Sequence, residues 1–152
     1  MLILQTPSDF HAHIGQTIGT SDWLTIDQDR IDAFARATGD DFWIHVDVER
    51  AAREMPGGKT IAHGLLMLGL VPLLQRQIFK VEKRGKGLNY GSDRVRYTAQ
   101  VPVGSQVRLK QSVRAVEKVA AGTRVTTDCV IELQGSERPA VVAEFILLLQ
   151  DG

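Results

Sequence analysis

The stretch IAHGLLMLGLVPLL, residues 61–74, is the longest apolar run in the chain and decides the fold. Its apolar side chains would cover every face of a helix, so such a helix must be surrounded by other structure. The run is shorter than the ~18–20 residues that a bilayer-spanning helix needs, and His63, Gly64 and Pro72 interrupt it. We therefore expect one long buried helix over residues 60–80, kinked or loosened at Pro72.

The second half of the chain shows the two-residue alternation of apolar and polar side chains that is typical of half-buried strands. Turns are expected at Ala121-Gly122 and near Gly135, and the nearly all-apolar residues 140–149 predict a central strand covered on both faces. A lone buried helix followed by a run of strands predicts an α+β fold, with an antiparallel sheet wrapped around the helix. The predicted strands cover residues 15–24, 89–99, 106–115, 125–133 and 140–149.

A one-sided helix is expected nearer the amino end, over residues 25–38. Thr25 and Gln28 have the spacing of a capping box at its start, and Gly39 provides a stop. A shorter helix is expected to begin after Asp47 as its N-cap.

The composition limits the classes of function that the chain can have. Its 152 residues suit one domain, residues 1–152, and its 18 basic and 18 acidic residues cancel. No net charge points to nucleic acid or to an anionic membrane as a partner. The single cysteine, Cys129, excludes an intrachain disulfide, and the amino end lacks the features of a signal peptide, so we expect a cytoplasmic protein.

The segment TGDDFWIH, residues 38–45, carries the strongest candidate chemistry. On a continuous helix Asp40 and His45 would lie about 140° apart, at ~100° per residue, and could not face one substrate atom. In an irregular loop after the stop at Gly39 the two side chains can converge. A carboxylate and an imidazole around one water form an acid–base pair, although by spacing alone a turn residue and a solvated histidine are the commoner interpretation.

The pair His63-Gly64 opens the predicted buried helix and is the second candidate feature. The amide groups of a first helical turn are free donors, and Gly64 has no side chain to block a ligand carbonyl, so its N–H is a candidate oxyanion donor. The alternative is that Gly64 only permits close helix–sheet packing. By itself His63 is more often a core histidine than a ligand.

Two basic or histidine-rich features carry weaker hypotheses. Positive side chains that could meet the phosphates of a nucleotide-tailed substrate cluster at Lys80, Lys83, Arg84 and Lys86, although solvated lysines are commoner. His11 and His13 lack further ligands nearby, so we predict no metal site there.

Taken together, these motifs resemble the MaoC-like dehydratase family of hot-dog proteins, which includes the R-specific enoyl-CoA hydratases. The family motif Gly-Asp-x-Asn-Pro-(Leu/Ile/Val)-His is matched at Gly39, Asp40, Ile44 and His45, and its later His-Gly pair at His63 and Gly64. The similarity extends over about residues 15–150, through NYGSDRVRY at 89–97 and VPVG at 101–104.

Three residues depart from the common pattern. Phe42 and Trp43 replace the Asn-Pro pair, and Pro72 stands where some hydratases have a serine on the central helix. Trp-Ile-His together with Asn-Tyr-Gly is similar to a nodulation-protein-N-like branch, which keeps the Asp and the His. The departures therefore bear on substrate scope more than on the type of reaction.

The resemblance implies a single hot-dog domain acting as a hydratase or dehydratase of fatty acid metabolism. Asp40 and His45 would hold the water that adds to a trans-2-enoyl-CoA, giving a (3R)-hydroxyacyl thioester, with Gly64 and His63 on the substrate side. It implies a homodimer, an acyl-CoA substrate and no metal or redox cofactor.

Other functions stay open at the level of sequence. An acyl-carrier-protein dehydratase would run the reverse reaction, and a non-catalytic hot-dog module would only bind acyl thioesters. A thioesterase is less favoured, because the water would then have to attack the carbonyl carbon. The intact Asp40 and His45 argue against a pure binding module.

Overall fold

The computed structural model describes residues 1–152, and its largest element is a six-stranded sheet. Along the main path every neighbouring pair is antiparallel, and β3 (Leu24–Thr25) adds to β6 outside that path. The order across the sheet is β2 (Thr17–Thr20), β6 (Gln106–Val119), β7 (Gly122–Leu133), β8 (Val141–Asp151) and β5 (Arg84–Tyr97).

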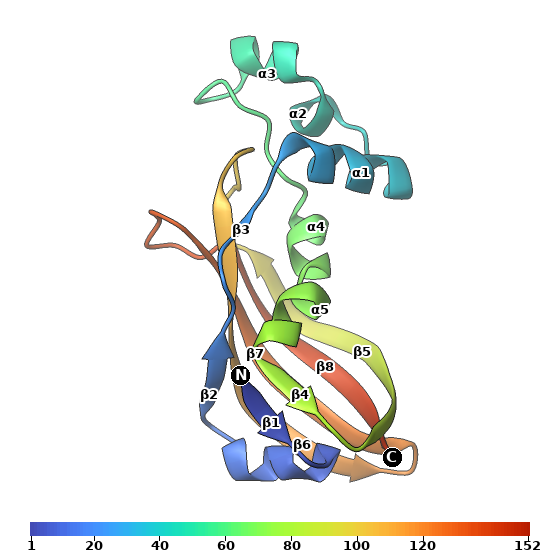
Figure 1. The fold of residues 1–152 in the computed structure, drawn as a ribbon. Helices are drawn as coiled ribbons and strands as arrows, with labels where there is room; N and C mark the ends of the chain where they lie inside the picture. The colour runs from blue at the N-terminus through green and yellow to red at the C-terminus, as the bar shows by residue number, and fades with distance from the viewer.

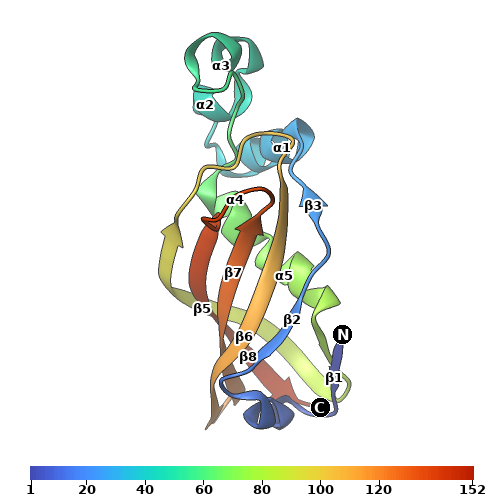
Figure 2. The same cartoon turned by 90° about the vertical axis from the view of Figure 1, so that its left-hand side faces the viewer.

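The sheet curves around a central helical segment, which confirms the predicted α+β class (Figure 1). That segment consists of α4 (Gly64–Gly69), α5 (Val71–Leu74) and a 3-10 turn, η2 (Gln75–Gln77). Figure 2 shows it lying along the inner face of the strands, with β5 at one edge of the sheet and β2 at the other.

The predicted helix over residues 60–80 is wrong at both ends, and it is interrupted close to the expected kink. Residues 60–63 are extended, and Ile61 forms an isolated bridge with Pro102. The helix breaks at Leu70, two residues before the expected kink at Pro72, which has no N–H to donate to the preceding turn. Its last predicted residues instead form the strand β4 (Phe79–Val81).

The central helix is also less covered than its sequence predicted. Leu65 is 60% exposed and Leu73 is 41% exposed. The adjoining edge strand β5 exposes Leu88 and Tyr90, by 57% and 60%. A single protomer therefore leaves apolar side chains uncovered along the helix and the sheet edge beside it.

One core lies between the helix and the sheet. It is a single cluster of 25 buried residues, and the predicted alternation of β6 and β7 is confirmed by the burial of their inward-facing residues. Cys129 is one of them. The strand β8 is central, as predicted, but only one of its faces is fully buried.

The helices α1 (Gln28–Thr38), α2 (Trp43–Val46) and α3 (Val48–Glu54) form an overhang beyond one end of the sheet (Figures 1 and 2). The carboxylate of Asp27 caps α1, so the predicted capping box at Thr25 is wrong. Gly39 ends α1 with φ of 81°, and Asp47 caps α3, both as predicted. The short helix α2 lies where an irregular loop was expected.

The amino-terminal segment was not predicted. The strand β1 (Leu2–Leu4) pairs in parallel with β4, and the 3-10 helix η1 (Pro7–His13) follows it. None of the helices combines the length and apolar character that a membrane-spanning helix requires.

Candidate active site

Asp40 and His45 lie together where the overhang meets the central helix. Gly39 turns the chain out of α1, and the short helix α2 returns His45 toward Asp40. One side-chain atom each from Asp40, His45 and His63 lies within 4.8 Å of the other two. Asp40 is exposed and His45 is half-buried, so solvent reaches the space between them.

Hydrogen bonds fix the orientation of the His45 ring. Its Nδ1 lies 2.7 Å from the carbonyl oxygen of Ile61, to which it donates in the tautomer that this contact requires. The Ile61 amide in turn donates to the carbonyl of Ile44 at 3.0 Å. This leaves His45 Nε2 as a free acceptor, which is the state that a general base needs.

A half-buried side-chain amide, that of Gln28, supports the backbone of His45. The Gln28 side chain donates to the backbone carbonyl of His45 at 2.8 Å, and it accepts the Thr60 hydroxyl at 2.6 Å. Thr60 is 1% exposed. The sequence indicated only a capping role for Gln28, because the contacts that hold its side chain join segments far apart in the chain.

His63 lies behind His45 and is 3% exposed. Its Nε2–H donates to the backbone carbonyl of Asp40 at 2.8 Å, and its ring stacks on that of His45 with centroids 3.8 Å apart. Phe34 packs on the same ring at 4.8 Å. His63 Nδ1 is buried and has no hydrogen-bond partner. The residue thus ties the Asp40 loop to the start of α4.

The same three residues would be the first candidates for a metal site, but the ring geometry does not suit one. A metal lies about 2.0–2.1 Å from an imidazole nitrogen, along its in-plane lone pair. The rings of His45 and His63 are stacked at 23° to each other, so their lone pairs do not converge on one such point.

Gly64 lies beside this pair, in a small cavity of about 180 Å³ that we call the active-site pocket. The Gly64 N–H makes no hydrogen bond within the protein. A Cβ added to Gly64 would lie 2.6 Å from the Tyr97 ring, so close helix–sheet packing also requires a glycine here. Burial raises the pKa of Tyr97. The pocket is lined mainly by His45, Ile61, Gly64, Met67, Tyr97 and Ala140.

The two aromatic residues between Asp40 and His45 have different surroundings. Trp43 begins α2, and the Arg50 guanidinium lies 4.1 Å from the centre of its ring. Phe42 is 57% exposed. Trp43 therefore holds the corner between α2 and α3, whereas Phe42 presents an apolar ring at the surface near the pair.

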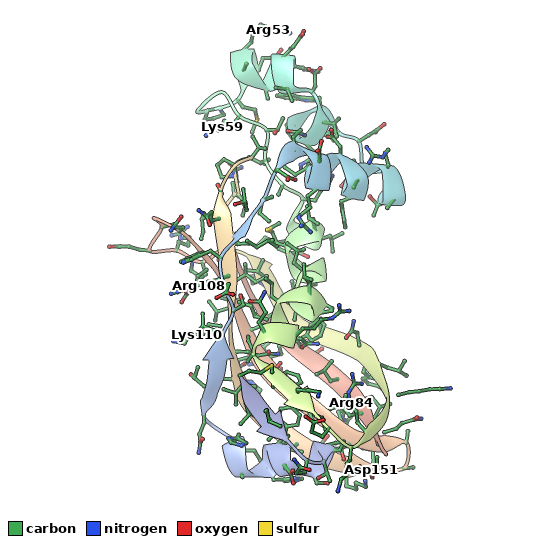
Figure 3. The ribbon with its side chains drawn as sticks, viewed as in Figure 1. Arg53, Lys59, Arg84, Arg108, Lys110 and Asp151 are labelled. Carbon is green, nitrogen blue, oxygen red and sulfur yellow. The ribbon has the colours of Figure 1, made fainter.

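The structure divides the predicted basic cluster. Lys80 and Arg84 line a second, larger cavity between α5, β4 and the sheet, which we call the distal cavity. Lys83 and Lys86 are exposed and do not line it. Figure 3 shows Arg84 at the end of the molecule away from Arg53 and Lys59 of the overhang.

The sequence of this chain is similar to those of known proteins over nearly its whole length. Residues 9–133 match the MaoC-like domain. The chain is 46% identical over 148 residues to 3-hydroxyacyl-thioester dehydratase Z of Mycobacterium tuberculosis, covering 97% of each. It is 42% identical over 145 residues to nodulation protein N of Rhizobium leguminosarum bv. viciae, covering 94% of this chain and 90% of that protein.

Solved structures with the same architecture include two R-hydratases. That of Pseudomonas aeruginosa, PhaJ1, superposes with a TM-score of 0.72 at 22% identity, covering 91% of this chain and 83% of that one. The (R)-hydratase of A. caviae involved in PHA biosynthesis gives 0.70 at 24%, with 89% and 95% covered. The predicted hot-dog fold is therefore confirmed.

Proposed function

This chain belongs to the MaoC-like domain family, and from that premise we propose that it is an (R)-specific enoyl-thioester hydratase, which also catalyses the reverse dehydration. It would add water to trans-2-enoyl thioesters to give (3R)-hydroxyacyl thioesters, and the similarity to 3-hydroxyacyl-thioester dehydratase Z supports that class of reaction. We predict a place in cytoplasmic fatty acid metabolism.

The observation that carries the proposal is the juxtaposition of the Asp40 carboxylate with His45. The bond from His45 Nδ1 to Ile61 leaves Nε2 as the proton acceptor. A water between the two side chains can therefore be polarised by Nε2 and oriented by the carboxylate. No metal or redox group is needed for this step.

The hydration reaction consumes one water molecule. Its oxygen bonds to C3 of the enoyl group while His45 Nε2 takes one of its protons. The electron pair of the C2–C3 double bond moves toward C2 and the thioester carbonyl, and a proton passed through the pair then forms the new C2–H bond. In the reverse direction the same two groups remove the C2 proton and protonate the leaving hydroxyl.

The thioester carbonyl would lie beside Gly64. Its unpaired N–H and its position in the active-site pocket with His45 support a role in polarising that oxygen. We place His63 behind the pair, since its side chain is buried and bonded to the Asp40 backbone. It acts by holding Asp40 rather than by contacting substrate.

The carrier of the acyl group is proposed to be coenzyme A. The exposed charges of Lys80, Lys83, Arg84 and Lys86 are suited to its phosphates. An acyl-carrier-protein dehydratase remains the alternative, because both carriers present the same pantetheine thioester.

We also propose a homodimer joined through β5. This strand is an edge of the sheet, so one row of its backbone groups has no partner strand. It exposes Leu88 and Tyr90, and Leu65 of the central helix is exposed as well. Pairing of two β5 strands would join the two sheets side by side and cover these side chains.

Hydration of crotonyl-CoA, followed by chiral analysis of the 3-hydroxybutyryl product, tests the proposal. Asp40→Asn and His45→Gln should each lower kcat by about 10²–10⁴-fold, since each removes a group that handles a proton. Asp41→Asn and His13→Gln are matched controls, because they make the same chemical changes outside the pair and should leave the rate unchanged.

Three results would contradict the proposal. They are full activity in both site variants, an (S)-hydroxy product, and release of free coenzyme A without hydration. The last would instead support a thioesterase. Ligand-induced stabilisation without any turnover would support a binding module.

A further inference from the structure

The distal cavity carries chemistry that the acid–base pair does not use. Its volume is about 600 Å³, within the range of small-molecule sites. Part of its lining is apolar, with Pro72 from α5, Phe79 from β4, and Leu147 and Leu149 from β8. A site of this size has room for an extended chain.

The lining of the distal cavity also contains basic side chains, and no acidic residue in the lining offsets their charge. Arg76 and Arg84 both line it, and neither makes an ion pair. Lys80 also lines it but pairs with Glu82 at 2.9 Å. No lining residue is acidic. Two free guanidinium groups at the border of an apolar cavity favour an anion attached to an apolar body.

Local contacts direct Arg84 toward this space. Asp151, its partner residue across β5 and β8, gives its carboxylate to Lys118 instead. A guanidinium nitrogen of Arg84 lies where a Cβ on Gly87 would be, so the glycine leaves room for that group at the lining. Of the basic cluster in the sequence, Lys80 and Arg84 thus line the cavity, Arg84 without an ion pair, and Arg76 from η2 joins them.

The distal cavity and the active-site pocket lie at opposite ends of the same two elements. Gly64 and Gln75 border the two spaces and are eleven residues apart on the central segment, which corresponds to about 16 Å along a helix. Ala140 and Leu147 border them at the sheet, about 23 Å apart along an extended strand. An anion bound at the distal cavity can therefore belong to a thioester whose reacting carbons lie at His45.

We propose that the distal cavity binds the anionic end of the substrate, with Arg76 and Arg84 on the anion and the apolar wall along the chain that carries it. The inference rests on the proposed hydratase function. The shared chemistry is an anion tethered to the thioester across roughly 16–23 Å. This anion can be either the phosphates of the carrier or a carboxylate at the far end of the acyl chain.

The test compares three thioesters in the purified full-length protein. Crotonyl-CoA has phosphates and a short acyl group. A long-chain ω-carboxy-2-enoyl N-acetylcysteamine thioester has a far carboxylate and no phosphate. Crotonyl-N-acetylcysteamine has neither, so its hydration reports on the acid–base pair alone.

Arg76→Gln combined with Arg84→Gln removes the two free charges, and Lys110→Gln combined with Arg138→Gln removes two exposed charges elsewhere. The first double variant should raise the KM for a substrate with a tethered anion about tenfold or more, with kcat nearly unchanged. The control double variant should match the unaltered protein. Arg76→Lys combined with Arg84→Lys should recover part of the loss.

Each outcome is decisive. A raised KM for crotonyl-CoA alone supports the carrier phosphates as the source, and a raised KM for the ω-carboxy substrate alone supports the acyl end. Unchanged KM values for both overturn the distal anion site. If neither crotonyl-CoA nor crotonyl-N-acetylcysteamine is hydrated by the unaltered protein, the hydratase proposal itself fails, separately from the role of the cavity.

Discussion

The imidazole rings of His45 and His63 are stacked with their centroids 3.8 Å apart and their planes inclined by 23°. Each ring uses one nitrogen to hold a backbone carbonyl, Ile61 for His45 and Asp40 for His63. The proposed catalytic pair is therefore positioned by two part-buried contacts that cross from the overhang to the segment before α4.

His63→Phe keeps an aromatic ring against His45 but removes the bond to the Asp40 carbonyl. We expect kcat to fall roughly tenfold with little change in KM, because the lost group positions Asp40 and contacts no substrate. The free energy of unfolding should fall by about 1–3 kcal/mol. Steady-state kinetics and urea denaturation measure the two effects.

His63→Gln is the matched variant, since its amide can still donate to that carbonyl. It should recover part of kcat, and its pH profile should remain closer to that of the unaltered protein than the Phe variant does. A Phe variant with full kcat would show that His63 only fills space.

Gly64→Ala should reduce both stability and rate. The new Cβ would lie 2.6 Å from Tyr97 Cγ, so the tyrosine must move at a cost of about 1–3 kcal/mol. Adding Tyr97→Leu should restore most of the stability measured by thermal unfolding. Additive losses in the double variant would argue that Tyr97 is not the obstacle.

Cys129 predicts a dependence of stability on alkaline pH. Desolvation by burial raises the pKa of the thiol from 9.0 to about 11. The folded state therefore favours the protonated thiol, and this preference stabilises the protein fully below pH 9 and is lost as pH rises toward 11. The loss should be about 2–3 kcal/mol.

The matched variant for this effect is Cys129→Ala, which has no thiol to ionise. Urea denaturation between pH 8 and pH 11 should show a steeper decline in the unaltered protein than in the variant. Parallel curves would contradict the prediction. At neutral pH the native thiol should also react with alkylating reagents only after unfolding.

Acidic side chains introduced at Leu88 and Tyr90 of β5 should prevent dimerisation. Leu88→Asp combined with Tyr90→Asp places two like charges on each edge strand, so two copies would bring four together. Sedimentation velocity should show a dimer for the unaltered protein and a monomer for this variant. Ile14→Asp, at another exposed apolar position, should stay dimeric, and a monomeric unaltered protein would refute the proposal.

The parts of the fold that were predictable depend on local pattern. The alternation in β6 and β7 follows from one buried face, and Gly39 adopts the left-handed conformation that glycine enters without steric cost. The parts that were not depend on distant pairing. Thr25 could not cap α1 because it pairs with Gln106, which left the cap to Asp27.

The same distinction applies to the sites. Asp40 and His45 were recognisable from their motif, whereas Gln28 and Thr60 act through contacts between distant segments. Residues 79–81 are strand rather than helix only because β1 pairs with them. The fold also brings Arg76 to the cavity that Lys80 and Arg84 line, a placement that the sequence did not indicate.

The overhang carries Asp40 and His45 beyond the end of the sheet, and of its three helices only α1 contributes a residue, Ile31, to the 25-residue core. Such a segment opens at a lower free energy than the whole domain does. Heating should therefore inactivate the protein before it melts, and amide hydrogens of α2 and α3 should exchange faster than those of β7. If Asp40 and His45 act as proposed, activity is a more sensitive measure of the integrity of the overhang than secondary structure is.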